Sequence, residues 1–251
     1  MATKDHQSEP IESASETLQR IFDGHGSVLG SQMADESSRY DVLKKTDFPK
    51  PKRTRRIAVA NQKGGVGKTT STVNTAAALA NKGAQVLVID MDPQGNASTA
   101  LGVSHASGEP SVYDVIEGRS DLGDVITVCP DFPTLDVVPA SIDLSGAELE
   151  VADLPNRNTL LKEALDLYLR QSDKHYDYVF IDCPPSLGLL VINAMCAVTE
   201  MLIPIQAEYY ALEGLGQLIN TIGLVQEHFN PVLLVSTMLV TMFDRRTLLS
   251  R

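Results

Sequence analysis

The sequence predicts an α/β fold in which a mostly parallel β-sheet is covered by helices on both faces. From Ile57 onward, short apolar runs alternate with stretches of helical periodicity, which is typical of parallel sheets. Two of the runs, VLVID (residues 86–90) and YVFID (residues 178–182), are almost continuously apolar, as strands buried on both faces are. A glycine-rich loop separates the first strand from the first helix, which indicates a phosphate-binding turn.

The elements follow one another in a regular order along the chain. Strands are predicted over residues 57–60, 85–90, 135–139, 177–182, 201–206 and 232–241. Helices are predicted over residues 68–81, 158–170, 187–198 and 212–229, with Asn158 as an N-cap. We therefore predict that residues 56–251 form one α/β domain.

Residues 1–55 differ from this domain in composition. Residues 1–43 carry 3 basic and 8 acidic residues, whereas residues 44–56 carry 7 basic residues and a single acid. Since the segment has few apolar residues to offset the entropy lost on ordering, we predict a disordered extension that could include a short helix over residues 15–22. The basic run has two interpretations, a solvated linker, which we favour, and a contact to DNA or a membrane.

Composition argues against several classes of protein. The net charge of −11 and pI near 4.8 disfavour a body that holds nucleic acid through bulk positive charge, so a DNA contact would need a local patch. There is no apolar run of about eighteen residues and no signal-peptide pattern. The three cysteines form no C-x-x-C pair, and the five histidines are scattered. We expect a cytoplasmic protein with reduced, buried thiols and no stable membrane association.

The loop at residues 61–70, NQKGGVGKTT, is the strongest functional signal in the chain. Its glycines allow positive φ and leave room for the backbone to approach an anion at the start of a helix. In this pattern Lys68 reaches the β- and γ-phosphates of a nucleotide, and the Thr69 hydroxyl is a ligand of Mg²⁺. We therefore predict a P-loop NTPase-type fold that binds ATP and Mg²⁺; the alternative is a glycine-rich turn that binds nothing. The predicted nucleotide-binding residues are Lys63, Gly64, Gly65, Val66, Gly67, Lys68, Thr69 and Thr70.

Three acidic residues follow two of the predicted strands. Asp182 ends the run at residues 178–182, where it can hold Mg²⁺ directly or through water. Asp90 ends the run at residues 86–90, and Asp92 lies on the loop that follows. Because a mobile carboxylate can position an attacking water, we assign catalysis to Asp92 and a supporting role to Asp90. The alternative is that these acids serve the turns that follow the strands.

The loop departs from the ordinary pattern G-x-x-x-x-G-K-[ST] in two ways. The first glycine should fall at position 62, where this chain has Gln62, and a second lysine, Lys63, stands five residues before Lys68. Together with DMDPQGNAS, FIDCPPSLG, EYYALEGL and TMFDRRT, the loop resembles the ParA/Soj family of DNA-partitioning ATPases, in the deviant Walker-A class. The resemblance runs from about residue 56 to the end of the chain.

The resemblance implies roles for individual residues. Lys63 would reach the nucleotide of a partner subunit and neutralise charge there. The predicted catalytic residues are therefore Lys63 and, from its place on the loop after residues 86–90, Asp92. Arg246, with Arg245 beside it, would contact DNA without sequence specificity. The alternative for Arg246 is an ion pair with the acid that precedes the two arginines.

The resemblance also implies a cycle in a bacterial, nucleoid-associated protein. ATP binding would make a homodimer that binds DNA non-specifically, and a ParB-like partner would stimulate a slow hydrolysis that releases the DNA. The chain ends at Arg251, where family members continue, so the C-terminal part of the domain is expected to be missing. Two rivals stay open: a truncated subunit that binds nucleotide or partners without turnover, and a MinD-like division-site ATPase, which would need a C-terminal amphipathic helix.

Overall fold

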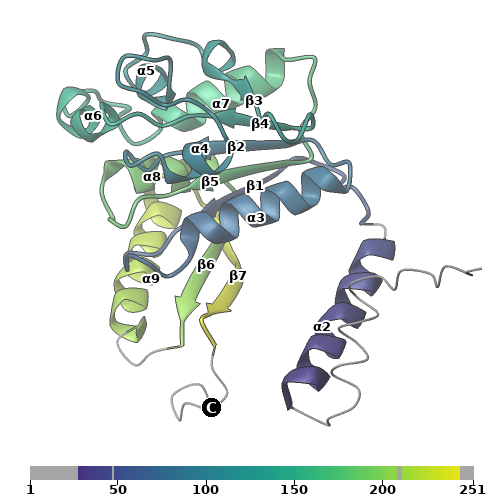
Figure 1. The fold of residues 1–251 in the computed structure, drawn as a ribbon. Helices are drawn as coiled ribbons and strands as arrows, with labels where there is room; N and C mark the ends of the chain where they lie inside the picture. Colours follow the sequence, from purple (N-terminus) through teal and green to yellow (C-terminus); the bar gives the residue numbers. More distant parts are fainter. Residues whose placement is uncertain (1–27, 47, 208–210, 244–251) are drawn as a thin grey trace, which may run out of the picture. The chain divides into compact units, whose positions relative to one another are not determined.

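The computed structural model describes residues 28–46, 48–207 and 211–243. The chain divides into two units, residues 1–49 and 50–251, and each is described by itself. The larger unit holds a seven-stranded sheet in the order β3-β4-β2-β5-β1-β6-β7 (Figure 1). Its strands are β1 (Arg55–Val59), β2 (Val86–Asp90), β3 (Thr127–Val128), β4 (Leu135–Val138), β5 (Tyr178–Asp182), β6 (Glu200–Gln206) and β7 (Leu234–Thr241). Every pair is parallel except β3 with β4, which confirms the predicted mostly parallel sheet.

Helices lie on both faces of this sheet (Figure 1). They are α3 (Lys68–Asn81), α4 (Asn96–Ala100), α5 (Val112–Ile116), α6 (Leu144–Glu150), α7 (Leu160–Gln171), α8 (Leu189–Ala197) and α9 (Ala211–His228), with a 3₁₀ turn at Leu122–Val125. Helix α3 connects β1 to β2, and α8 connects β5 to β6. These parallel crossovers bring the carboxyl ends of the central strands to one edge of the sheet.

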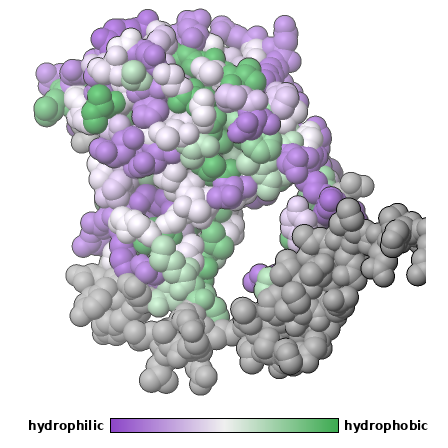
Figure 2. Space-filling view, viewed as in Figure 1, coloured by the Kyte–Doolittle hydropathy of each residue, from purple (hydrophilic) through white to green (hydrophobic). Residues whose placement is uncertain are grey.

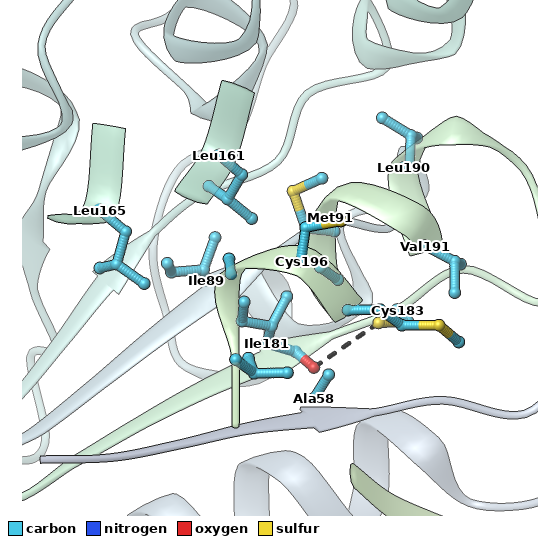
Figure 3. Close-up of a cluster of buried hydrophobic side chains, with 14 of the residues drawn as sticks. Ala58, Ile89, Met91, Leu161, Leu165, Ile181, Cys183, Leu190, Val191 and Cys196 are labelled. Atoms are coloured by element: carbon cyan, nitrogen blue, oxygen red, sulfur yellow. Dashed lines mark hydrogen bonds between the residues drawn. The ribbon is translucent and has the colours of Figure 1, made fainter. Parts of the chain in front are cut away.

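Two hydrophobic clusters fill the space between the sheet and the helices. Because successive strand residues face opposite sides, Ala58 belongs to the cluster that includes α7 and α8, whereas Val59 belongs to the cluster under α3. Figure 3 shows the first of these, in which Ile181 from β5 lies among side chains that include Leu161 and Leu165 from α7. The central strands are therefore packed against hydrophobic side chains on both faces of the sheet.

The edge strand β7 departs from this buried pattern. Its side chains are exposed or half-buried throughout, and Met238, Leu239 and Val240 are among the exposed apolar residues. Figure 2 shows apolar surface in the lower part of the view, where β7 forms the edge of the sheet. The two central strands β2 and β5, by contrast, are buried over almost their whole length.

Several predicted boundaries differ from the structure. The first strand begins at Arg55 rather than at residue 57, and α7 begins at Leu160 after Thr159, so the prediction of Asn158 as the N-cap is wrong. The strand predicted over residues 135–139 is β4, whereas the other short elements between residues 96 and 150 were not predicted. They have between two and seven residues each, which is too short for a periodic pattern to stand out.

The first unit contains a helix, α2 (Val28–Lys45), where the sequence predicts a mostly disordered segment. Residues 33–45 include no glycine or proline, and Lys44 and Lys45 lie in the last turn, where basic side chains interact favourably with the helix dipole. All side chains described from residue 33 to residue 45 are exposed, so α2 has helical propensity without a buried face. The short helix predicted over residues 15–22 lies outside the described residues.

Two expectations drawn from composition concern the cysteines and membrane-spanning helices, and both can be compared with the structure. The thiols of Cys129, Cys183 and Cys196 are all free and buried. Across the residues that the structure describes, no helix combines the length and the apolar character needed to cross a membrane.

Candidate nucleotide-binding site

Three of the predicted motifs meet at one edge of the sheet. Strand β5 lies between β1 and β2, and its last residue, Asp182, is in register with Val59 on one side and Asp90 on the other. The glycine-rich loop (residues 61–67) leaves β1 almost directly after Val59. The loop and the acids that end β2 and β5 therefore converge at the carboxyl edge of the sheet, where α/β folds place their ligands.

The loop has the conformation that an anion-binding turn needs. Gly65 has a φ of 73° and Gly67 a φ of 90°, both in the left-handed region that favours glycine. Gly67 is the N-cap of α3 and offers no side chain, so the amides of the first helical turn are available to a phosphate. Gly64 does not have a positive φ, so its backbone conformation does not itself require glycine. Thr70, in the first turn of α3, is exposed.

Lys68 is a buried cation aimed back at the loop. Only 7% of the residue is exposed, and its ammonium group donates a hydrogen bond to the carbonyl oxygen of Lys63 at 3.3 Å. Burial lowers the pKa of Lys68, while the nearby Asp182 and Asp92 oppose that shift. A phosphate beside this lysine would add an anion that its ammonium group can bond directly, so the residue fits a nucleotide.

Asp182 is bound to α3 through two hydroxyl groups. The Oγ1 of Thr69 donates to Asp182 Oδ2 at 2.7 Å, and the Oγ1 of Thr72 donates to Oδ1 at 3.0 Å. Burial is the largest cause that raises the pKa of Asp182 to about 7; the charges of Asp90 and Asp92 add to it, and the two hydroxyls oppose it. The paired oxygens of Thr69 and Asp182 are ligands of the type that Mg²⁺ prefers, and a cation there would stabilise the buried carboxylate. Among the described residues no group of three His, Cys, Asp or Glu side chains could hold a metal by itself.

Asp90 and Asp92 differ in their surroundings. Asp90 is fully buried and accepts hydrogen bonds from the amide and hydroxyl of Ser98, at 2.8 and 2.7 Å, and from the amide of Asp92 at 3.1 Å. Burial raises the pKa of Asp90. Asp92 Oδ1 accepts from the amide of Gln94 at 3.0 Å, within the loop itself. Asp90 thus anchors the loop, and Asp92 is carried by it.

The loop that carries Asp92 is held by a contact that the sequence analysis missed. Gly95 donates its amide to the carbonyl oxygen of Asp92 at 2.8 Å and has a φ of 63°. The ring of His105 packs closely on Gly95, so that a Cβ atom added at Gly95 would lie 2.5 Å from His105 Nδ1. The same ring forms a hydrogen bond through Nε2 with the hydroxyl of Thr99 at 2.8 Å. No sequence pattern links His105 to Gly95, because their contact depends on the turn between them.

The glycine-rich loop is also fastened to the ends of β6 and β7. Thr241 donates to the carbonyl oxygen of Val66 at 2.9 Å, and Lys63 donates from Nζ to Gln206 Oε1 at 2.9 Å. Lys63 therefore points to its own β6 in this structure, whereas Lys68 points into the loop. The predicted DNA-binding residues Arg245 and Arg246 lie outside the described residues.

Comparison with known proteins identifies relatives of this chain. The profile of a family described as an AAA domain matches residues 54–235. The sporulation initiation inhibitor protein Soj of Bacillus subtilis (strain 168) is 51% identical over 191 residues, which cover 76% of this chain and 74% of that protein. The chromosome partitioning protein ParA of Caulobacter vibrioides (strain NA1000 / CB15N) is 46% identical over 194 residues, 77% of this chain and 72% of that protein.

The chain belongs to the ParA/Soj family. One solved structure similar to this ParA/Soj-family chain is that of cobyrinic acid a,c-diamide synthase from Mycobacterium smegmatis with bound ADP and magnesium. It is 40% identical and has a TM-score of 0.72, and the matched region covers 79% of this chain and 78% of that protein. The predicted P-loop fold and family are thus confirmed.

Proposed function

We propose that this ParA/Soj-family chain is an ATP-dependent DNA-segregation switch that hydrolyses ATP slowly. The observation that carries the proposal is the hydrogen bond from Thr69 to Asp182, because it joins the first turn after the glycine-rich loop to the acid of the neighbouring strand. This is the arrangement with which P-loop enzymes hold Mg²⁺ beside a nucleotide. The partitioning names of the relatives and the ADP and magnesium of the solved neighbour support the same assignment.

Each residue of the site has a separate task in this proposal. Lys68 binds the β- and γ-phosphates of ATP, together with the amides at the start of α3. Thr69 and Asp182 hold Mg²⁺, the latter directly or through water, and the bound ion neutralises phosphate charge. Asp92 orients the attacking water, and Asp90 fixes the loop that carries it.

The switch itself depends on a second subunit. Lys63 reaches the nucleotide of the partner in an ATP-dependent homodimer and neutralises charge there. The dimer binds DNA non-specifically through Arg245 and Arg246, and a ParB-like protein stimulates hydrolysis and release. The proposed location is the nucleoid in a bacterial cytoplasm.

Phosphate release from ATP tests the catalytic assignment. We expect Mg²⁺-dependent turnover in the unmodified chain, a decrease of about 100-fold or more in Asp92→Ala, and retained ATP binding in that variant. Asp131→Ala is the matched control, because Asp131 is an exposed acid on another loop. Unchanged turnover in Asp92→Ala would overturn its role, and ATP binding without turnover in the unmodified chain would favour the non-hydrolysing subunit.

Partner binding separates the proposed switch from the MinD-like alternative. We expect the ATP-bound protein to bind mixed-sequence duplex DNA with an affinity that decreases steeply as salt rises, because phosphate contacts displace counterions. Arg246→Ala should weaken this binding for every DNA sequence. Sedimentation with anionic lipid vesicles instead of DNA binding would favour the MinD-like alternative.

A further inference from the structure

The ring of His105 contacts both the turn that contains Asp92 and the short helix that follows it. The turn is closed by the hydrogen bond from the Gly95 amide to the Asp92 carbonyl oxygen at 2.8 Å, and α4 begins directly after Gly95. The ring lies against Gly95, which is buried, and forms its hydrogen bond with the Thr99 hydroxyl one helical turn further along. A hydroxyl can donate or accept, so this bond forms with either tautomer of the ring. His105 thus joins the end of the turn to α4.

The turn needs a restraint from outside because a glycine closes it. Gly95 has a φ of 63°, and a glycine can adopt many other backbone conformations. Asp90 accepts the amide of Asp92 at 3.1 Å and the amide of Ser98 at 2.8 Å, so it fixes the turn from one side. Neither bond involves Gly95. The His105 ring fills the space beside Gly95, so the ring restricts how far the turn can move.

His105 is itself held in place by Glu109. Oε2 of Glu109 accepts hydrogen bonds from the hydroxyl of Ser104 at 2.5 Å and from the amide of Ala106 at 3.1 Å. These are the residues on either side of His105. The two bonds lower the pKa of Glu109, so the acceptor is an ionised carboxylate at neutral pH. The backbone at His105 is therefore fixed by charge-assisted hydrogen bonds on both sides.

The same loop is anchored to α6. Asp143, the N-cap residue of α6, accepts hydrogen bonds from the hydroxyl of Ser107 at 2.8 Å and from the amide of Gly108 at 3.1 Å. Residues 104–109, the brace, are thus fastened to the domain through contacts that do not involve Asp90. The Asp92 turn is consequently held from two sides, by Asp90 and by the brace.

We propose that His105 is a positioning residue that keeps the Asp92 turn in the conformation needed for hydrolysis. The inference rests on the proposed function, in which Asp92 orients the attacking water. A group that orients water is effective only within hydrogen-bond reach of it, so a looser turn lowers the rate of hydrolysis. In the proposed function Lys68 and the amides of α3 bind the phosphates, so ATP affinity does not depend on the brace.

Three substitutions separate the ring from its hydrogen bond. His105→Ala removes both, and we expect kcat to decrease roughly 5- to 20-fold while KM for ATP changes by less than about 2-fold. His105→Phe keeps a ring over Gly95 without the bond to Thr99, and Thr99→Val removes the hydroxyl, so each should lower kcat by roughly 2- to 5-fold. His105→Ala combined with Thr99→Val should be no slower than His105→Ala alone, because the bond is already lost.

Hydrogen exchange measures the turn in the absence of nucleotide. The amides of Gly95 and Thr99 are hydrogen-bonded within residues 91–100. We expect this segment to exchange roughly 3- to 10-fold faster in His105→Ala, because the loss of a contact favours local opening. Exchange in α9 should stay the same, which distinguishes a looser turn from a general loss of stability.

The matched control is His175→Ala, because His175 is exposed and precedes β5, whereas the nucleotide site lies at the end of that strand. This variant should change neither kcat nor the exchange of residues 91–100. Slower hydrolysis at unchanged KM and faster exchange of that segment in His105→Ala, with an unchanged control, support the positioning role.

Two results would overturn it. If residues 91–100 exchange at the same rate in His105→Ala, or if its kcat is unchanged while Asp92→Ala is inactive, the positioning role is wrong and the proposed function stands. If the unmodified chain hydrolyses no ATP, or if Asp92→Ala is equally active, the proposed function is wrong and the positioning role with it.

Discussion

Replacing Asp182 by asparagine should stabilise the nucleotide-free protein while abolishing its Mg²⁺-dependent binding of ATP. Asp182 is fully buried and has its pKa raised from 3.8 to about 7, with burial as the largest cause. Asparagine has nearly the same shape, and it can still hydrogen-bond the hydroxyls of Thr69 and Thr72. The substitution therefore removes a negative charge that destabilises the nucleotide-free protein and that Mg²⁺ binding requires.

The magnitude follows from the pKa shift. A carboxyl group whose pKa is raised in the native state binds its proton more tightly when the protein is folded, so stability is lost as pH rises between about 4 and about 7. With ~1.4 kcal/mol for each pKa unit, the raised pKa of Asp182 lowers the free energy of unfolding by about 1.5 kcal/mol at pH 5, where the folded carboxyl is protonated, and by about 4 kcal/mol at pH 8, where it is ionised. For a domain of this size, a gain of 4 kcal/mol corresponds to a rise in Tm of roughly 10 °C.

The assay is thermal unfolding in EDTA, without nucleotide, between pH 5 and pH 8. The difference in Tm between Asp182→Asn and the unmodified protein should grow with pH, and the exposed Asp131→Asn should show no such trend. Titration with ATP and Mg²⁺ should then stabilise the unmodified protein and leave Asp182→Asn unaffected. A variant that is equally or less stable at pH 8 would refute the reasoning about the buried charge.

Two further substitutions test how the loops of the site are held. Thr241→Val removes the hydrogen bond to the glycine-rich loop, so it should lower ATP affinity several-fold and the free energy of unfolding by about 1 kcal/mol. Thr237→Val, at an exposed position on the same strand, should change neither quantity. Calorimetry measures the affinity, and urea unfolding measures the stability. Gly95→Ala combines a left-handed φ with a clash against His105, so it should destabilise the protein by more than Gly108→Ala, which has a φ of 80° and open space and should lose only about 1 kcal/mol. Equal losses in the two glycine variants would show that His105 yields freely.

The parts of the fold that could be predicted are those with a strong local pattern. The strands β2 and β5 are continuous apolar runs that end on Asp90 and Asp182, and parallel order then brings both acids to the loop after β1. The tasks proposed for Lys68 and Thr69 follow from the spacing of these residues in the glycine-rich loop.

The contacts that could not be predicted join distant segments. Lys63 and Gln206 are 143 residues apart, and Val66 and Thr241 are 175 apart, so only the finished sheet brings them together. Helix α2 was missed for a different reason. Its residues favour a helix, whereas the expectation of disorder rests on the scarcity of apolar side chains in this segment.

The measurement that tests the central claim most directly is molar mass by light scattering with ADP and with ATP and Mg²⁺, using Asp92→Ala to block hydrolysis. The account predicts the mass of one chain, 27.2 kDa, with ADP and twice that mass with ATP, and it predicts that Lys63→Ala abolishes the increase. A mass that is the same with either nucleotide, or a dimer that persists without Lys63, would contradict a nucleotide-driven switch built on this site.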